Sequence, residues 1–183
     1  YTRLYTLSLH DALPISKLIT GSLRSLWVVG AALVLWSLVM WIAEQRHDTL
    51  AAEGRQRGEG QVSIKDGLQI GLMQCLSLVP GVSRSGATIS TGLLLGIDRL
   101  TATRLSFFMA IPALTAAGLY ELKDVNTAVV GWGQLGVGTI VSFIVAYASI
   151  AWLLRFVATN SLRAFVYYRV PLGLLILGLV GAG

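Results

Sequence analysis

GLQIGLMQCLSLVPGVSRSGATISTGLLLGI, residues 67–97, is uncharged throughout except for Arg84 near its middle. Its two halves, 67–79 and 86–97, are each too short to cross a bilayer, which takes about 20 apolar residues. The turn between them contains Pro80, which has no N–H to donate within a helix. Irregular backbone at membrane depth is tolerated only where it is buried in protein or lines a cavity. The segment therefore predicts a helical hairpin that enters the membrane and returns to the same side.

The turn and the residues after it, PGVSRSGAT at 80–88, combine a lone arginine with small and hydroxyl-bearing side chains. Ionisable residues at membrane depth are costly and usually mark a site. Arginine offers a planar fork of donors that suits phosphate oxygens, and glycine lets the backbone approach a ligand closely. A helix that begins near residue 85 would direct its free N–H groups to the same place. We therefore expect a phosphate-binding loop formed by Gly81, Ser83, Arg84, Ser85, Gly86 and Thr88.

A plainer interpretation of the loop stays open at this point. Serine and threonine are common at helix N-termini, where their side chains accept hydrogen bonds from the backbone. In that case the hydroxyl groups only cap a helix, and Arg84 pairs with a carboxylate elsewhere in the protein.

The composition indicates an integral membrane protein. The chain of 183 residues is 55% hydrophobic and 13% charged, and its mean hydropathy is +0.71, whereas soluble domains have about 25% charged residues. The net charge of +5 does not indicate nucleic-acid binding, because the basic residues are scattered among hydrophobic segments and form no stripe.

Four segments besides the hairpin are expected to cross the membrane: 18–43, 100–120, 127–154 and 164–182. Residues 44–66 are polar and mixed in charge, so they predict an aqueous loop in which His47 is solvated. The expected fold class is all-α, a multi-span helical bundle with a re-entrant helical hairpin at about 67–97.

Basic residues in the expected loops set the orientation. If the hairpin re-enters, the loops 44–66, 98–104 and 155–163 share one side, and the opposite loop 121–126 holds a single basic residue, Lys123. The positive-inside rule makes the first side cytoplasmic and places the C-terminus outside. The basic residues on the cytoplasmic side are Arg46, Arg55, Arg57, Lys65, Arg99, Arg104, Arg155 and Arg163.

The first sixteen residues, YTRLYTLSLHDALPIS, do not follow the pattern of the remainder. They lack the basic and apolar regions of a signal peptide and resemble translated adapter sequence. We expect 1–16 to be a non-native leader, and 17–183 to be the C-terminal part of a single membrane domain whose natural sequence extends further upstream.

Hydrolysis at such a loop would need a general acid or base as well as a phosphate site. After residue 16 the acidic residues all lie at or near expected loop positions, and no histidine, aspartate or glutamate is expected within the membrane. The chain is therefore expected to hold half of a catalytic site. The acidic residues are Glu44, Asp48, Glu53, Glu59, Asp66, Asp98, Glu121 and Asp124.

The stretch QIGLMQCLSLVPGVSRSGATISTGLLLGIDR, 69–99, followed by LSFFMAIPA, 105–113, resembles the second signature region of the undecaprenyl-diphosphate phosphatase family, also called bacitracin-resistance proteins. The family pattern PGxSRSxxT fits residues 80–88 without departure. The resemblance runs from about Lys17 through NSLRAFVYYR, 160–169, to the C-terminus.

The resemblance implies a multi-pass hydrolase of the bacterial inner membrane. Such enzymes remove the terminal phosphate of undecaprenyl diphosphate and regenerate the lipid carrier for peptidoglycan synthesis, which links them to cell shape and to resistance against bacitracin. It assigns phosphate binding and catalysis to Ser83, Arg84 and Thr88, with Gly81 shaping the loop. It also implies an inverted-repeat fold with one re-entrant hairpin in each half. This chain would be the second half, without the glutamates, serine and histidine of the first.

The partners and cofactors expected from the resemblance are few. They are a polyprenyl diphosphate lipid and the membrane, with no nucleic acid, and the resemblance allows a homodimer. No cofactor is expected to be bound by this chain, although a divalent cation, Mg²⁺ or Ca²⁺, is allowed in the full enzyme. A second class of function also fits the hairpin, because transporters and flippases of anionic lipids or ions use inverted repeats and broken helices whose N-termini face anionic groups.

Overall fold

The computed structural model describes residues 25–122 and 131–182, and within them four helices are long and apolar enough to cross a membrane. These are α2 (Leu26–Ala52), α5 (Arg99–Glu121), α6 (Trp132–Thr159) and α7 (Arg163–Ala182). Two shorter helices, α3 (Ile64–Gln74) and α4 (Arg84–Leu94), lie between α2 and α5 in the chain, together with the 3-10 turns η2 (Glu59–Gln61) and η3 (Cys75–Leu78). The predicted all-α membrane class is confirmed. The predicted leader, the start of the first span and most of the loop 121–126 lie outside the described residues.

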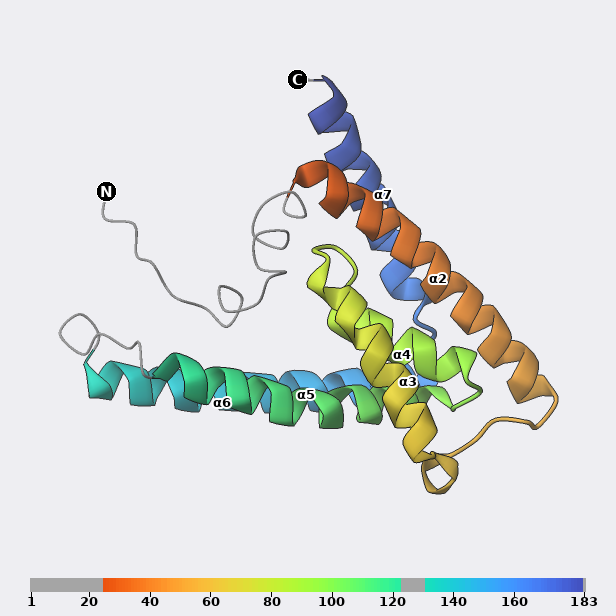
Figure 1. Ribbon diagram of the computed structural model, residues 1–183, viewed down its shortest axis with the longest axis horizontal. Helices are drawn as coiled ribbons and strands as arrows, with labels where there is room; N and C mark the ends of the chain where they lie inside the picture. Colours follow the sequence, from red (N-terminus) through yellow and green to blue (C-terminus); the bar gives the residue numbers. More distant parts are fainter. Residues whose placement is uncertain (1–24, 123–130, 183) are drawn as a thin grey trace.

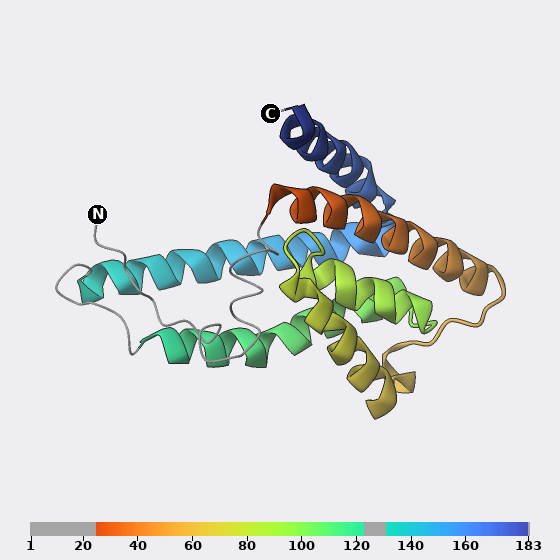
Figure 2. The same ribbon diagram turned by 45° about the horizontal axis from the view of Figure 1, so that its top comes forward.

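The helices form two arms that meet at the short pair α3 and α4 (Figure 1). Helices α2 and α7 pack along one arm, and α5 and α6 run alongside each other in the second (Figures 1 and 2). Glycine permits the close approach of α2 and α7, because a Cβ on Gly173 would lie 2.9 Å from the carbonyl oxygen of Gly30. Helix α4 packs against α2, α3 and α5, so it occupies the junction of the arms.

Helix α4 is the most enclosed element of the fold. Eight consecutive residues, 86–93, are buried, and five of them are glycine, serine or threonine: Gly86, Thr88, Ser90, Thr91 and Gly92. By contrast, α6 buries only Val157 among its 28 residues and exposes apolar side chains along its length, as expected for a surface that faces lipid or further protein. The sequence that was singled out for its lone arginine therefore lies at the centre of the structure.

Arg57 ties the two outer ends of the hairpin together. Its guanidinium donates to both carboxylate oxygens of Asp66, each at 2.8 Å, and to the carbonyl oxygen of Leu95 at 2.7 Å. Asp66 lies in the first turn of α3, and Leu95 follows the last residue of α4. The hydrogen bonds from Arg57 hold the pKa of Asp66 well below its usual range, so this carboxylate stays charged. The start of α3 and the end of α4 therefore lie next to each other, as a re-entrant hairpin requires.

The prediction of an aqueous loop over 44–66 is wrong for residues 44–52. Helix α2 continues through Ala52, and its last turns pack against other elements instead of leaving the protein. Glu44 is completely buried, and His47 is only 8% exposed, so the prediction of a solvated His47 is also wrong. The charged residues of this stretch predicted exposure to water, but their side chains contact arginines from distant parts of the chain.

The re-entrant placement of the hairpin in a membrane remains a prediction, and labelling of cysteines tests it. Lys65→Cys and Asp98→Cys should both react with an impermeant maleimide from the cytoplasmic face, each in a Cys75→Ser background because Cys75 is the chain's single cysteine and is exposed. Glu121→Cys, at the far end of α5, should react from the opposite face. Asp98 caps α5, and losing the cap costs about 1 kcal/mol, which should leave the fold intact. Labelling of residues 65 and 98 from opposite faces would contradict the topology.

Candidate functional site

The turn before α4 holds two residues in the left-handed region of backbone conformation. Gly81 has a φ of 100° and Ser83 a φ of 74°. A Cβ on Gly81 would lie 2.6 Å from the carbonyl oxygen of Val29 in α2, so the space admits only glycine. Serine rarely adopts a positive φ, and such conformations persist only where the surroundings hold them. The expected phosphate loop therefore has a backbone shape that the rest of the fold must maintain.

Ser83 caps the N-terminus of α4. Its Oγ accepts a hydrogen bond from the N–H of Gly86 at 3.3 Å and lies 3.3 Å from the Oγ of Ser85. The plainer interpretation is thus correct in that a serine caps the helix. The same arrangement also places two hydroxyl groups beside the positive end of the α4 dipole, which favours an anion.

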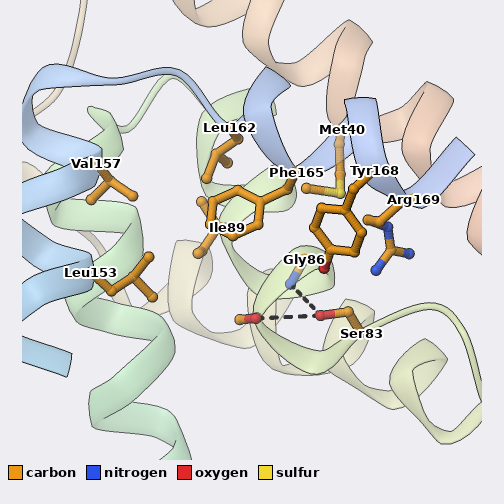
Figure 3. A pocket seen from close by; sticks show the side chains of 11 residues that line it. Met40, Ser83, Gly86, Ile89, Leu153, Val157, Leu162, Phe165, Tyr168 and Arg169 are labelled. Carbon is orange, nitrogen blue, oxygen red and sulfur yellow. Dashed lines mark hydrogen bonds between the residues drawn. The ribbon is translucent and has the colours of Figure 1, made fainter. Parts of the chain in front are cut away.

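A cavity of about 140 Å³ opens beside these hydroxyl groups. Figure 3 shows Ser83 and Gly86 on one side of it, and Tyr168 and Arg169 reaching in from α7 on another. The remaining walls are apolar and come from α2, α4, α6, α7 and the turn before α7: Met40, Ile89, Leu153, Val157, Leu162 and Phe165. Its polar lining consists of hydroxyl groups, backbone N–H and a guanidinium, and among the described residues no carboxylate or imidazole lines it.

Arg84 lies on a different side of the loop. Its partly buried side chain lines a groove of about 360 Å³ between α5 and α6 together with Arg104. Within residues 25–122 and 131–182, the Arg84 guanidinium makes no hydrogen bond and no ion pair, so the alternative in which it pairs with a carboxylate is not seen in this part of the chain. The rest of the groove is apolar: Phe107, Phe108, Ala110, Ile111, Leu114, Ile150 and Leu154.

Thr88 is separate from both cavities. It is fully buried, and its Oγ1 lies 2.7 Å from the Oγ of Ser106 in α5 and 3.0 Å from the carbonyl oxygen of Arg84. The structure thus places the six expected residues in four settings. Gly81 forms the turn, the residues Ser83, Ser85 and Gly86 face one cavity and Arg84 the other, and Thr88 braces the first turn of α4 against α5.

Arg169 is a residue of the site that sequence reasoning did not select. It is 6% exposed, and its guanidinium donates to the carbonyl oxygens of Gly81 at 2.6 Å and Val82 at 3.3 Å. The signal was present, because Arg169 is a lone charge inside the apolar span 164–182. Nothing in the linear order connects it to residue 81, so the sequence alone did not link it to the loop.

A second buried polar cluster joins the ends of three helices. The carboxylate of Glu44 accepts from Arg99 at 2.6 and 3.0 Å and from the backbone N–H of Leu162 at 2.9 Å. Asp48 accepts from Arg163 at 2.7 Å. The cluster therefore connects α2, the start of α5 and the turn before α7.

Glu44, His47 and Asp48 present ligand atoms within 4.8 Å of one another, a spacing that could hold a metal ion. The donor chemistry does not fit one. Arg99 lies against Glu44 at 2.6 Å and against Asp48 at 3.6 Å, so a guanidinium already occupies the position that a cation would take. These residues form an ion-pair network rather than a metal site.

Comparisons with known proteins agree with the motif in the loop. Undecaprenyl-diphosphatase 1 of Streptomyces avermitilis is 57% identical over 170 residues, which cover 91% of this chain and 58% of the relative. Undecaprenyl-diphosphatase 1 of Streptomyces coelicolor is 54% identical over 169 residues, with coverage of 91% and 58%. Undecaprenyl-diphosphatase of Cutibacterium acnes is 51% identical over 172 residues, with coverage of 88% and 58%. The chain thus spans about 58% of the length of these curated relatives.

The family described as "Bacitracin resistance protein BacA" matches residues 8–175, which include all the helices described here except the end of α7. The match begins inside the segment 1–16, whose foreign origin remains a prediction. On this match and these identities, the chain belongs to the BacA bacitracin-resistance family.

Proposed function

We propose that the full-length protein to which this chain corresponds hydrolyses undecaprenyl diphosphate to undecaprenyl phosphate and inorganic phosphate, and so recycles the lipid carrier of peptidoglycan synthesis. The observation that carries the proposal is Arg84, an arginine without a partner in the described residues at the N-terminus of the buried helix α4. The names of the relatives support the substrate and the reaction.

The loop residues have distinct roles in this proposal. Arg84 binds two phosphate oxygens through its guanidinium, and Ser83 and Ser85 donate hydrogen bonds to others. The N–H groups at the start of α4, near Gly86, stabilise negative charge as it develops in transfer. Gly81 allows the shape of the turn. These groups line two cavities separated by the loop backbone, so a diphosphate that engages all of them must lie across the helix N-terminus.

Thr88 acts through the backbone in this proposal. Its hydrogen bond to the carbonyl oxygen of Arg84, and its contact with Ser106, hold the first turn of α4 against α5. This is how a fully buried threonine can take part in the site to which the resemblance assigns it.

The reaction also needs groups that the described residues do not place at the loop. The oxygen of a water molecule attacks the terminal phosphorus, the bond from that phosphorus to the bridging oxygen breaks, and undecaprenyl phosphate leaves. A base must take the proton of the water. We infer that this base belongs to the part of the protein that the relatives have beyond the match, since none of the described residues that line the cavity beside Ser83 carries a carboxylate or imidazole.

Location and partners follow from the same proposal. We propose that the protein is a multi-pass protein of the bacterial inner membrane that takes its lipid substrate from that membrane, and that it functions as a homodimer. A divalent cation, Mg²⁺ or Ca²⁺, if the full enzyme uses one, is not held by Glu44, His47 and Asp48, because Arg99 occupies that cluster. The comparisons do not favour the transporter or flippase alternative, because the relatives are named as diphosphatases.

A phosphate-release assay in detergent tests the proposal. A full-length version should release phosphate from undecaprenyl diphosphate, whereas residues 1–183 alone should show no measurable turnover, because catalytic groups act as a unit. Co-expression with the family's N-terminal part should restore some activity. Absence of release by the full-length version would contradict the proposed function, and robust release by 1–183 alone would show that the base lies within this chain.

A further inference from the structure

Arg169 is a buried charge without a counter-ion in the described parts of the chain. Within 25–122 and 131–182 it forms no ion pair, and it donates to the carbonyl oxygens of Gly81 and Val82 and to the Oγ of Ser37, the last at 3.4 Å, with the Tyr168 side chain as a further hydrogen-bonding neighbour. Burying an arginine inside a membrane helix costs free energy, so such an arginine usually has a functional role. Two of its acceptors are consecutive carbonyl groups of one turn, so the guanidinium is directed at the backbone of that turn.

That turn is the segment that most needs external support. Gly81 and Ser83 both have positive φ, and Val82 lies between them. The hydrogen bonds from Arg169 fix the peptide groups on either side of Val82, and these set the conformation at Ser83. A serine at a φ of 74° is sparsely populated in a free chain and persists where neighbouring groups hold it.

The position of Arg169 also connects α7 to α4 across the cavity. Figure 3 shows its guanidinium beside Ser83, with Tyr168 from the same helix covering the space above Gly86. Ser83 caps α4, so a shift in the turn would move both the Ser83 hydroxyl and the start of the helix that bears Arg84. The hydrogen bonds of one side chain can therefore set the geometry of the whole loop.

We propose that Arg169 is a positioning residue that holds the turn 81–83 in its positive-φ conformation and thereby places Ser83 and Arg84 for reaction with phosphate. The inference rests on the proposed function for its effect on turnover. The conformational part applies to the turn itself and does not depend on the substrate.

Kinetics of a full-length version test the positioning role. Arg169→Met should lower kcat by at least about tenfold, because small displacements of catalytic groups slow reactions strongly, while KM changes less. Arg169→Lys should recover part of the loss, since an ammonium group can donate to both carbonyl groups of the turn. Arg155→Met is the matched control, because Arg155 lies exposed on α6 and its guanidinium has no partner in the described residues; it should behave as wild type. Unchanged kcat in Arg169→Met, or a lysine variant no better than the methionine variant, would overturn the proposal.

A double-mutant cycle separates positioning from direct phosphate binding. Gly81→Ala distorts the same turn through the clash with Val29. If Arg169 acts through the turn, Arg169→Met should add little to the effect of Gly81→Ala on kcat. Additive losses would mean that Arg169 acts independently of the turn, and would overturn the proposal.

The turn can also be followed without substrate. Val82 is 6% exposed, so Val82→Cys in a Cys75→Ser background should react slowly with a thiol reagent. Adding Arg169→Met should accelerate the reaction, whereas adding Arg155→Met should not. Equal rates would overturn the inference about Arg169 even if wild-type turnover is normal. Absence of turnover in the wild type, with the acceleration present, would instead count against the proposed function alone.

Discussion

Replacing Arg84 by alanine in a full-length version should lower phosphate release from undecaprenyl diphosphate by at least about 100-fold, the usual cost of removing one preorganised donor from a charged transition state. In the described part of the chain the guanidinium has no other partner, so its full donor set is available to the substrate. It projects from the first residue of α4, where the helix dipole favours an anion. Membrane insertion should be unchanged, because the Arg84 guanidinium makes no hydrogen bond or ion pair to the described helices.

Arg84→Lys distinguishes recognition of phosphate geometry from simple charge. Lysine keeps the positive charge but presents a single ammonium group, which cannot bind two oxygens side by side. We expect the lysine variant to be clearly impaired as well. Arg155→Ala, which removes an exposed arginine without a partner in the described residues, should keep wild-type activity and serves as the control. Near-normal turnover in Arg84→Lys would show that bidentate binding is not required, and near-normal turnover in Arg84→Ala would remove Arg84 from the site.

The sequence predicted the spans and the hairpin because both depend on local patterns. The length of apolar runs separates α5, α6 and α7 from α3 and α4, and Pro80 marks the break before α4. Local patterns did not predict where α2 ends. The polar residues at 44–52 predicted a loop. In the structure Glu44 instead accepts hydrogen bonds from Arg99 and Leu162, which are 55 and 118 positions away in the chain. No local pattern reveals such partners.

The candidate site was predictable in composition and not in arrangement. The motif at 80–88 identified the loop, and the structure confirms that α4 begins there at Arg84. Ser83 and Arg84 face different cavities because Ser83 has a positive φ. The sequence does not predict this backbone conformation. Arg169 enters from α7, 88 positions from Gly81, so its contact with the turn follows from tertiary packing alone.

Glu44→Ala should lower the free energy of unfolding by about 3–5 kcal/mol, the typical cost of removing one member of a buried ion pair. The Glu44 side chain is fully buried and that of Arg99 is only 15% exposed, so the substitution leaves a charge with little access to water. The backbone N–H of Leu162 loses its acceptor as well, at the turn that leads into α7. Because the cluster joins α2, α5 and α7, the loss should be seen as a lower midpoint of unfolding in detergent for the whole protein.

The chain offers a matched control for this prediction in Glu53, which also pairs with an arginine. Arg55 and Glu53 approach to 2.8 Å, close to the 2.6 Å between Arg99 and Glu44, but their side chains are 71% and 45% exposed. Exposed pairs contribute about 0–1 kcal/mol, so Glu53→Ala should have little effect on unfolding. Glu44→Gln should fall between the two alanine variants, because its amide oxygen can still accept from Leu162 while the charge is lost. Equal midpoints for Glu44→Ala and Glu53→Ala would mean that burial of the pair does not govern its contribution, and that the joined ends of the three helices are held by apolar packing instead.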